Sequence, residues 1–365
     1  MKRHNWLKKH TLGLAAALLV TAGMSQIALA GDSVYVNTSS LRYRTSAQIK
    51  DNNIAGNLSY GQKLERVGTS GQWTMILLNG KKYYVSSAYV TSKKPASAGA
   101  VQTTSQTAAG AQTSGGTAIA LSSNYKYANY SKINSGTATL YRSTASNKKN
   151  KVVCVNAGHG TNGGGSVKTQ CHPDGSAKVT GGTTGAGATS AVAVSSGMTF
   201  ADGTAESKVT LAMAKVLKTK LLNAGYDVLM IRESDDVQLD NIARTVIANN
   251  NADCHIALHW DSTSSNKGAF FMSVPSNATY RAMEPVASHW KQHNQLGESL
   301  ISGLKSAGVK IYSKGSMEMD LTQTSYSTIP SVDIELGDKA SDHSGATLET
   351  LANGLLAGVN TFFGQ

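Results

Sequence analysis

The chain has 365 residues, enough for two or three domains of ordinary size. Charged residues make up 15% of it, and Gly and Pro are near their usual shares, which excludes collagen-like and proline-rich proteins. Because 40% of the residues are hydrophobic, the chain can build a core, so full disorder is excluded as well. The net charge of +12 favours anionic partners.

Residues 1–30 have the pattern of an export signal. Met1–His10 is basic, Leu12–Val20 is a short apolar run, and Ala28-Leu29-Ala30 fits a cleavage site before Gly31. A membrane anchor is disfavoured because the run is shorter than the ~20 residues that span a bilayer. We therefore expect a secreted protein with no integral membrane segment. Cleavage would remove four cations and no acid, which lowers the net charge from +12 to +8.

Residues 31–90 read as short strands joined by turns, with no helical period. Asn79-Gly80 predicts a hairpin, because these residues accept the positive φ of a type I′ turn, and Tyr83-Tyr84-Val85 begins the return strand. The region therefore predicts a small all-β barrel. The other expected strands are Ser33–Val36, Leu41–Arg44, Lys63–Val67 and Trp73–Leu77.

This segment resembles the bacterial SH3-like domains that are appended to cell-wall enzymes. The resemblance implies that residues 31–90 bind the wall, and it names no ligand-binding residue. The residues that carry it are Leu41-Arg42-Tyr43-Arg44, Tyr60-Gly61-Gln62-Lys63-Leu64, Gly71-Gln72-Trp73, Asn79-Gly80 and Tyr84-Val85-Ser86-Ser87-Ala88-Tyr89-Val90.

Residues 91–123 are rich in Ser, Thr, Gly, Ala and Gln and lack periodicity, which is typical of a flexible linker. Residues 124–365 then form the expected catalytic domain, with its core at 150–365. The intervening residues 124–149 regain Tyr and Leu, so we expect them to lean on that core.

Strand and helix patterns alternate along residues 150–365, which predicts an α/β domain with a mixed, mostly parallel sheet flanked by helices. In such sheets the active crevice lies outside the carboxyl ends of the strands. The expected strands are Lys151–Asn156, Asp227–Ile231, Cys254–Leu258, Gly268–Val274 at a sheet edge, and Ser331–Glu335. The expected helices are Glu206–Leu222, Leu239–Ile247, Pro285–Ala307 and Ala346–Phe362.

Side chains suited to metal chemistry lie at the ends of these elements. His159 follows the first strand, His259 follows the third, and Glu206 begins the first helix. Two imidazoles and a carboxylate suit Zn²⁺, because three protein ligands leave a fourth position for water, whose pKa falls to about 7. Glu335 ends the last strand and could carry protons as an unliganded carboxylate.

Residues 151–365 resemble the zinc-dependent N-acetylmuramoyl-L-alanine amidases of the third family. The resemblance implies that His159, Glu206 and His259 hold the zinc ion. It also implies that Glu335 is the catalytic carboxylate. The matching residues are Val155-Asn156-Ala157-Gly158-His159-Gly160, Glu206, Leu222-Asn223-Ala224-Gly225-Tyr226-Asp227-Val228, Ile231-Arg232, Arg244, Ala248-Asn249, Ala252-Asp253, His259 and Pro330-Ser331-Val332-Asp333-Ile334-Glu335-Leu336-Gly337.

The sequence departs from that family in two places. His159 and Glu206 are 47 residues apart, which leaves a long Gly-rich insert, Thr161–Ala205. The insert either forms a lid or groove wall, as long loops near sites often do, or is a solvent-exposed ornament. Second, Trp260-Asp261 replaces the usual small residue and Asn after the metal histidine, which would alter the fit of the substrate.

The other histidines, Asp333 and the two arginines are not expected to bind the metal or to be the main catalytic group. His255 is expected to be a packed core histidine, because it lies about 13 Å along the strand from His259. His172 could reach the metal only through folding of the insert, and Asp333 is a back-up base on the face of Glu335. Arg232 and Arg244 are expected to hold loops or carboxylates, with a structural salt bridge as the favoured interpretation. The other histidines, His289, His293 and His343, are expected to be solvated.

Cysteine chemistry is not expected to carry the activity. Cys154 and Cys254 lie inside strand-like runs and are expected to be buried thiols, with a disulfide between them open only if their strands are neighbours. Cys171 lies in the insert.

The sequence thus predicts a secreted, wall-associated peptidoglycan hydrolase. Following the resemblance, it would cleave the amide between N-acetylmuramic acid and the L-alanine of the stem peptide. Two alternatives remain: a zinc peptidase or carboxypeptidase of the wall, and a non-catalytic wall-binding protein. The basic charge favours anionic wall polymers as partners. Nucleic acid would attract the same charge, but no motif for it is found, so none is predicted.

Overall fold

The computed structural model describes residues 32–36, 40–48, 53–59, 61–94 and 115–365. The expected export signal at 1–30 therefore lies outside the described residues, as does most of the expected linker. The chain divides into two compact units, Met1–Thr107 and Ala108–Gln365. Within the described ranges, every helix is too short or too polar to cross a bilayer.

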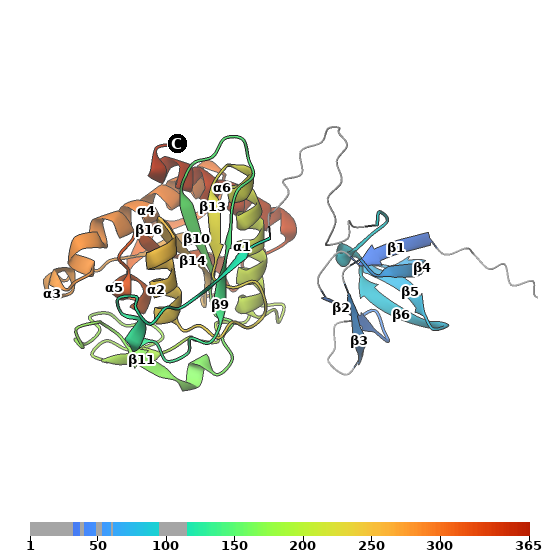
Figure 1. Ribbon diagram of the computed structural model, residues 1–365, viewed down its shortest axis with the longest axis horizontal. Helices are drawn as coiled ribbons and strands as arrows, with labels where there is room; N and C mark the ends of the chain where they lie inside the picture. The colour runs from blue at the N-terminus through green and yellow to red at the C-terminus, as the bar shows by residue number, and fades with distance from the viewer. Residues whose placement is uncertain (1–31, 37–39, 49–52, 60, 95–114) are drawn as a thin grey trace, which may run out of the picture. The chain divides into compact units, whose positions relative to one another are not determined.

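The N-terminal unit is all-β. Its strands form one antiparallel sheet in the order β3-β2-β6-β5-β4-β1-β7 (Figure 1). The bounds are β1 Asp32–Val36, β2 Ser40–Arg44, β3 Ile54–Ser59, β4 Lys63–Ser70, β5 Trp73–Leu78, β6 Lys81–Ser86 and β7 Val90–Thr91.

The predicted hairpin is confirmed at the junction of β5 and β6. Asn79 and Gly80 both have positive φ, 50° and 72°, and Leu78 pairs with Lys81 across the turn. The expected strands are present, whereas β3 and the short β7 were not predicted. The core of the unit is made of alternating inward-facing aliphatic residues: Val34, Val36, Leu41, Leu58, Leu64, Ile76 and Val85.

The C-terminal unit is an α/β domain with an eight-stranded mixed sheet in the order β16-β15-β17-β14-β10-β13-β9-β8. The four central strands β17, β14, β10 and β13 run parallel, as predicted. The strands are β8 Thr117–Ala120, β9 Thr137–Tyr141, β10 Val152–Ala157, β13 Asp227–Met230, β14 Cys254–Asp261, β15 Ala269–Ser273, β16 Ile311–Glu318 and β17 Ser331–Asp338. The helices are α1 Glu206–Asn223, α2 Asn241–Asn251, α3 Ala278–Ala282, α4 Val286–Ser306, α5 Thr322–Tyr326 and α6 Gly345–Phe363.

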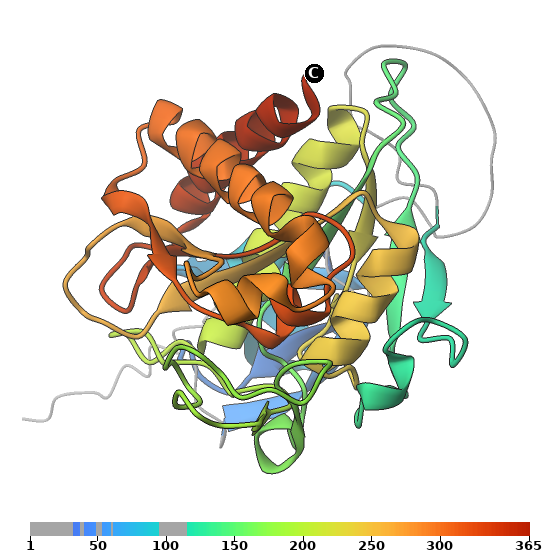
Figure 2. The same ribbon diagram turned by 90° about the vertical axis from the view of Figure 1, so that its left-hand side faces the viewer.

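Helices cover both faces of this sheet (Figures 1 and 2). Alternate residues of β10 point to opposite faces: Val153 and Val155 pack with α1, α4 and α6, whereas Cys154 packs with α2. Helix α1 buries an apolar stripe at every fourth residue, Val209, Met213, Leu217 and Leu221. Both layers of the core therefore follow from side-chain periodicity.

Two boundaries differ from the sequence prediction. The strand expected at a sheet edge, now β15, lies between β16 and β17, because β16 pairs with its outer side. At the other edge, β8 lies inside the range expected to be linker and pairs with β9. Residues 124–149 do contact the core, since β9 pairs with β13.

The three cysteines are free and buried. β10 and β14 are neighbours, but Cys154 is paired with His255 and Val153 with Cys254. This stagger of one residue sends the two thiols to opposite faces of the sheet, so a disulfide between Cys154 and Cys254 cannot form there.

Candidate active site and metal centre

Three side chains predicted as metal ligands converge at one point. Nε2 of His159 lies 2.9 Å from Oε1 of Glu206 and 3.0 Å from Nδ1 of His259, and the latter two atoms are 3.2 Å apart. These two nitrogens and one oxygen form a group that could hold a metal ion, with ligand atoms within 4.8 Å of one another.

Three separate elements bring these groups together. His159 follows β10 in a turn where its φ is 64°, Glu206 is the first residue of α1, and His259 lies near the end of β14. Beneath the ring of His259 lies Gly158, where a Cβ atom would come within 2.2 Å of the ring. The close approach requires glycine at this position.

Two buried arginines hold the turn that carries His159. Both Nη atoms of Arg244 donate to this turn, including a hydrogen bond of 2.7 Å from Nη2 to the carbonyl of His159. Arg232 donates to the carbonyl of Gly158. The predicted salt bridges are wrong: in the described ranges neither guanidinium is paired with a carboxylate. Burial lowers the pKa of Arg244 to about 9. Backbone carbonyls thus replace acids as partners.

Two of the three converging groups, His159 and Glu206, are held from behind by hydrogen bonds. Nδ1 of His159 donates to the carbonyl of Ser195 at 2.9 Å, which leaves the lone pair on Nε2 free to face the cluster. The Glu206 carboxylate accepts from the backbone N–H of Met198 at 2.8 Å and of Trp260 at 3.0 Å. Such outer contacts fix ligand orientation in metal sites.

The charges of the cluster shift one another's pKa values. Burial opposes ionisation of Glu206, but the neighbouring imidazoles of His159 and His259 outweigh it and hold its pKa well below the usual range. Burial likewise opposes protonation of His259, yet the neighbouring Asp333 and Glu206 raise its pKa to about 10. The carboxylates around the cluster thus favour positive charge at His259.

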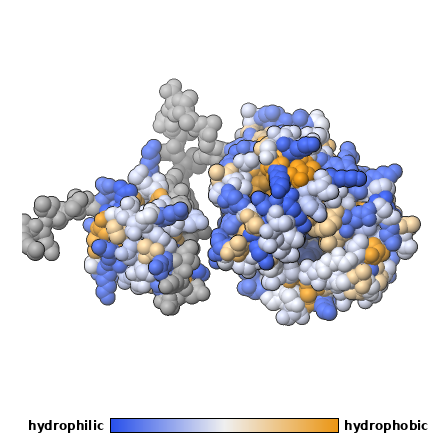
Figure 3. Space-filling model, turned by 180° about the vertical axis from the view of Figure 1, so that it is seen from behind, coloured by the Kyte–Doolittle hydropathy of each residue, from blue (hydrophilic) through white to orange (hydrophobic). Residues whose placement is uncertain are grey.

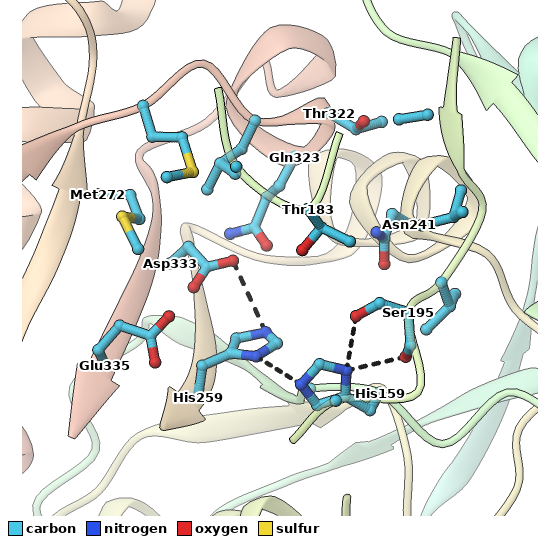
Figure 4. A pocket seen from close by; sticks show the side chains of 18 of the residues that line it. His159, Thr183, Ser195, Asn241, His259, Met272, Thr322, Gln323, Asp333 and Glu335 are labelled. Atoms are coloured by element: carbon cyan, nitrogen blue, oxygen red, sulfur yellow. Dashed lines mark hydrogen bonds and ion pairs between the residues drawn. The ribbon is translucent and has the colours of Figure 1, made fainter. Parts of the chain in front are cut away.

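Two further carboxylates face the cluster from β17 (Figure 4). Glu335 is the register partner of His259, and Asp333 lies two residues earlier on the same face. Burial, together with repulsion from Asp333, raises the pKa of Glu335 well above its ordinary value. One oxygen of Glu335, Oε2, is buried without a hydrogen-bond partner. Glu335 is therefore a carboxyl group in position to exchange a proton.

All these groups line one cavity of about 520 Å³ at the carboxyl ends of the central strands, where the sheet topology predicts a crevice. The insert Thr161–Ala205 supplies one wall, including Thr183 and Ser195. Figure 1 shows its green to yellow-green loops together at this end of the sheet, so the ornament interpretation is wrong. On the opposite side lie Met272 of β15 and Met317 of β16.

A fully buried carboxylate ties the insert to the domain. Asp320, after β16, accepts from the ring Nε2 of His172 at 3.0 Å and from the ammonium of Lys178 at 3.0 Å. It also accepts from the backbone N–H groups of Val179 and Thr180 at 2.8 and 3.1 Å. The insert, which also contains the paired strands β11 Lys168–Gln170 and β12 Ser190–Val192, is thus a fixed wall.

The other candidates lie away from the metal cluster. His172 binds Asp320 instead of the cluster, and His255 is fully buried in the core, as expected. The solvated interpretation of His293 is wrong: it is 1% exposed and accepts a hydrogen bond from the backbone N–H of Ser331. His289 and His343 are half-buried. Ser195 and Asp320 were missed, because no local pattern marks either.

Comparison with known proteins places this geometry. A family model described as N-acetylmuramoyl-L-alanine amidase matches residues 153–353, which is 201 of the 365 residues. The chain belongs to this amidase family. The matched range contains the three converging groups and Glu335, and the protein is accordingly an N-acetylmuramoyl-L-alanine amidase of cell-wall peptidoglycan. No curated protein sequence matches the chain.

Several solved amidase structures are similar to this amidase. Ami1 of Mycobacterium smegmatis has 18% identity and a TM-score of 0.49, with 60% of this chain and 99% of that chain covered. Ami1 of Mycobacterium abscessus has 19% identity and a TM-score of 0.45, with coverage of 58% and 98%. The amidase of Clostridium difficile 630 has 16% identity and a TM-score of 0.42, with coverage of 59% and 97%.

Proposed function

We propose that this amidase is a secreted, zinc-dependent enzyme that cleaves the amide between the lactyl group of N-acetylmuramic acid and the L-alanine of the stem peptide. In this proposal His159, Glu206 and His259 are the zinc ligands and Glu335 is the catalytic carboxylate. The observation that carries it is the convergence of three metal-binding groups in the cavity that also contains a buried, unliganded carboxyl group.

The donor set fits zinc. Two imidazole nitrogens and one carboxylate oxygen are the ligands of many catalytic zinc sites, and His159 already presents the lone pair of Nε2. Bound zinc would polarise the scissile carbonyl and lower the pKa of water at the open position. The protein itself holds His159 in place through Ser195, and Glu206 through the backbone N–H groups of Met198 and Trp260, while Gly158 lies against the ring of His259.

Glu335 has the properties of a proton carrier for amide hydrolysis. A group that takes a proton from water and then gives it to the leaving amine works best when its pKa lies near the working pH. Burial moves the pKa of Glu335 upward from 4.5, which is the required direction. Its buried Oε2 has no hydrogen-bond partner among the described residues, and the side chain lines the cavity in which a substrate would lie.

The residues that line the cavity support binding of a polar substrate. The polar lining of the cavity, which includes Thr183, Asn241 and Gln323, offers hydrogen bonds to a glycopeptide.

We assign wall attachment to an SH3-like barrel at residues 31–90, joined by a linker, on the basis of its sequence motifs and its apolar core. The leader at 1–30 supports secretion, and the basic charge supports binding to anionic wall polymers.

A conservative variant tests the division of roles. Glu335→Gln keeps the shape of the side chain but cannot carry the proton, so we expect kcat for release of stem peptides to fall by ~10²–10⁴-fold. Zinc content should remain near one ion per chain, whereas His159→Ala should lose the ion. A Glu335→Gln enzyme with wild-type kcat would show that another group moves the proton.

The metal is tested on the same purified wall. Chelation should stop the release of stem peptides by the wild-type enzyme, and added zinc should restore it. Release that continues after complete removal of metal would rule out the zinc mechanism.

A further inference from the structure

Asp333 occupies a distinct place beside the cluster. Its Oδ2 lies 3.7 Å from Nε2 of His259, which is the nitrogen on the side of the ring away from His159 and Glu206. The close-up in Figure 4 shows the Asp333 carboxylate pointing at the ring of His259, while the opposite edge of the ring points at His159. The ring of His259 thus lies between a carboxylate and the proposed metal position.

We infer that Asp333 is a positioning residue that holds the imidazole of His259 in the tautomer and orientation that bind the metal ion. The inference rests on the zinc site proposed above, and it replaces the expectation that Asp333 is a second base.

The tautomer argument is chemical. A neutral imidazole carries one proton, and only the nitrogen without it can donate a lone pair to a metal. The nitrogen of His259 that faces the cluster is Nδ1, so the proton has to reside on Nε2. A carboxylate beside Nε2 favours that arrangement and raises the basicity of Nδ1.

The packing argument is steric. Gly158 lies against the ring of His259, at a distance where a Cβ atom would come within 2.2 Å, so the ring is confined on that side. Asp333 then limits the remaining rotation of the ring, because its carboxylate contacts the ring at Nε2. The carboxylate is 17% exposed, so water competes little for it.

Electrostatics explains why a carboxylate at this position needs a cation nearby. Asp333 and Glu335 lie two residues apart on the same face of β17, and both side chains line the cavity. Two neighbouring buried carboxylates are unfavourable unless positive charge compensates them. An imidazole that is bound to a divalent cation and lies beside Asp333 would provide that compensation.

Zinc affinity measured by chelator competition on the metal-free protein tests the inference. Asp333→Asn retains the shape but not the charge, and Asp333→Leu removes both. We expect zinc affinity to fall in both variants, by ~10–100-fold for Asp333→Leu. The matched control is Asp261→Asn, because Asp261 is 18% exposed and lines the same cavity but pairs with Lys267. Zinc affinity of the control should stay within about threefold of wild type.

Thermal unfolding separates positioning from a general structural role. The midpoint of each metal-free variant serves as its own baseline, because Asp333→Asn also removes the ion pair with His259. The rise in midpoint on adding zinc should be smaller than in wild type, since ligand stabilisation follows affinity.

The outcomes distinguish the two proposals. If wild type fails to bind zinc, or His159→Ala binds it equally well, the proposed zinc site is wrong and this inference falls with it. If wild type binds zinc and His159→Ala does not, but Asp333→Leu binds as tightly as wild type, only the role of Asp333 is overturned. Equal losses in Asp333→Asn and Asp261→Asn would also overturn it, because they would reflect cavity charge alone.

Discussion

Gly158→Ala is a test of how tightly the backbone constrains the metal centre. The added Cβ would lie 2.2 Å from Cε1 of His259 and 2.5 Å from its Nε2. Ordinary contact begins at 3.4 Å, so the ring or the strand end has to retreat by about 1.2 Å. The strand end cannot move freely, because the Gly158 carbonyl accepts hydrogen bonds from Arg232 and Thr210 at 2.9 Å each.

The expected cost follows from that displacement. Misplacing a catalytic group by ~1 Å can reduce turnover by about 10²-fold, equivalent to ~2.7 kcal/mol in the barrier. We therefore expect Gly158→Ala to lower kcat/KM for stem-peptide release by about that factor and to weaken zinc binding. The assays are steady-state kinetics at saturating zinc and chelator competition.

Gly165→Ala is the matched control, because Gly165 lies in the insert and an added Cβ there has no neighbour within 4 Å. It should behave like wild type in both assays. If Gly158→Ala kept wild-type zinc affinity and kcat/KM to within about threefold, the rigid placement of His259 would be refuted.

Three further predictions concern the supports of the site. Arg244→Met leaves several buried carbonyls without their donor, including that of His159, so the free energy of unfolding of the metal-free protein in urea should fall by ~3 kcal/mol or more; a loss below ~1 kcal/mol would contradict this. Burial lowers the pKa of His255 from 6.5 to about 3, so below pH 6.5 the unfolded chain takes up a proton that the folded chain refuses, and stability falls as the pH falls. His255→Leu should reduce that fall by up to ~1.4 kcal/mol per pH unit below about pH 6 in urea unfolding, and an unchanged slope would show that His255 is not neutral in the fold. Asp320→Asn weakens the tie to Lys178 and His172, so limited proteolysis within the insert should accelerate and KM should rise more than kcat falls; unchanged cleavage and KM would show that other contacts hold the wall.

Local patterns were enough to predict most of the central architecture. The period of apolar residues in α1 and the short apolar runs of β10, β13, β14 and β17 place the parallel sheet. Once these strands are parallel, their ends meet, so His159, His259 and Glu335 have to lie near one another. Glu206 was matched through the family resemblance across a gap of 47 residues, and the helix that it begins supports that choice.

What the sequence left open depends on contacts between distant residues. Asp320 accepts a hydrogen bond from His172, which is 148 residues away in the sequence, and no local pattern predicts such a bond. The same holds for Arg244, which we expected in a salt bridge: its partners are backbone carbonyls, and these carry no sequence signature. β16 was missed because its exposed face gives it little apolar periodicity.

Surface properties are predictable only in bulk. Figure 3 shows hydrophilic residues over much of the visible surface of each unit, as expected for a chain in which the apolar residues fill cores. The position of the cavity wall that the insert forms, by contrast, depends on how the insert folds. Its Gly-rich composition suggested flexibility, yet buried hydrogen bonds around Asp320 hold it against the domain.

Mass spectrometry of purified peptidoglycan after digestion tests the proposed reaction most directly. The proposed mechanism predicts free stem peptides that begin with an L-alanine amino terminus and glycan strands whose lactyl carboxyls have lost their peptides. These products should disappear with a chelator, return with zinc, and be absent for Glu335→Gln. Cleavage within the peptide instead, with intact muramoyl–L-alanine bonds, would contradict the proposed bond and favour a zinc peptidase of the wall.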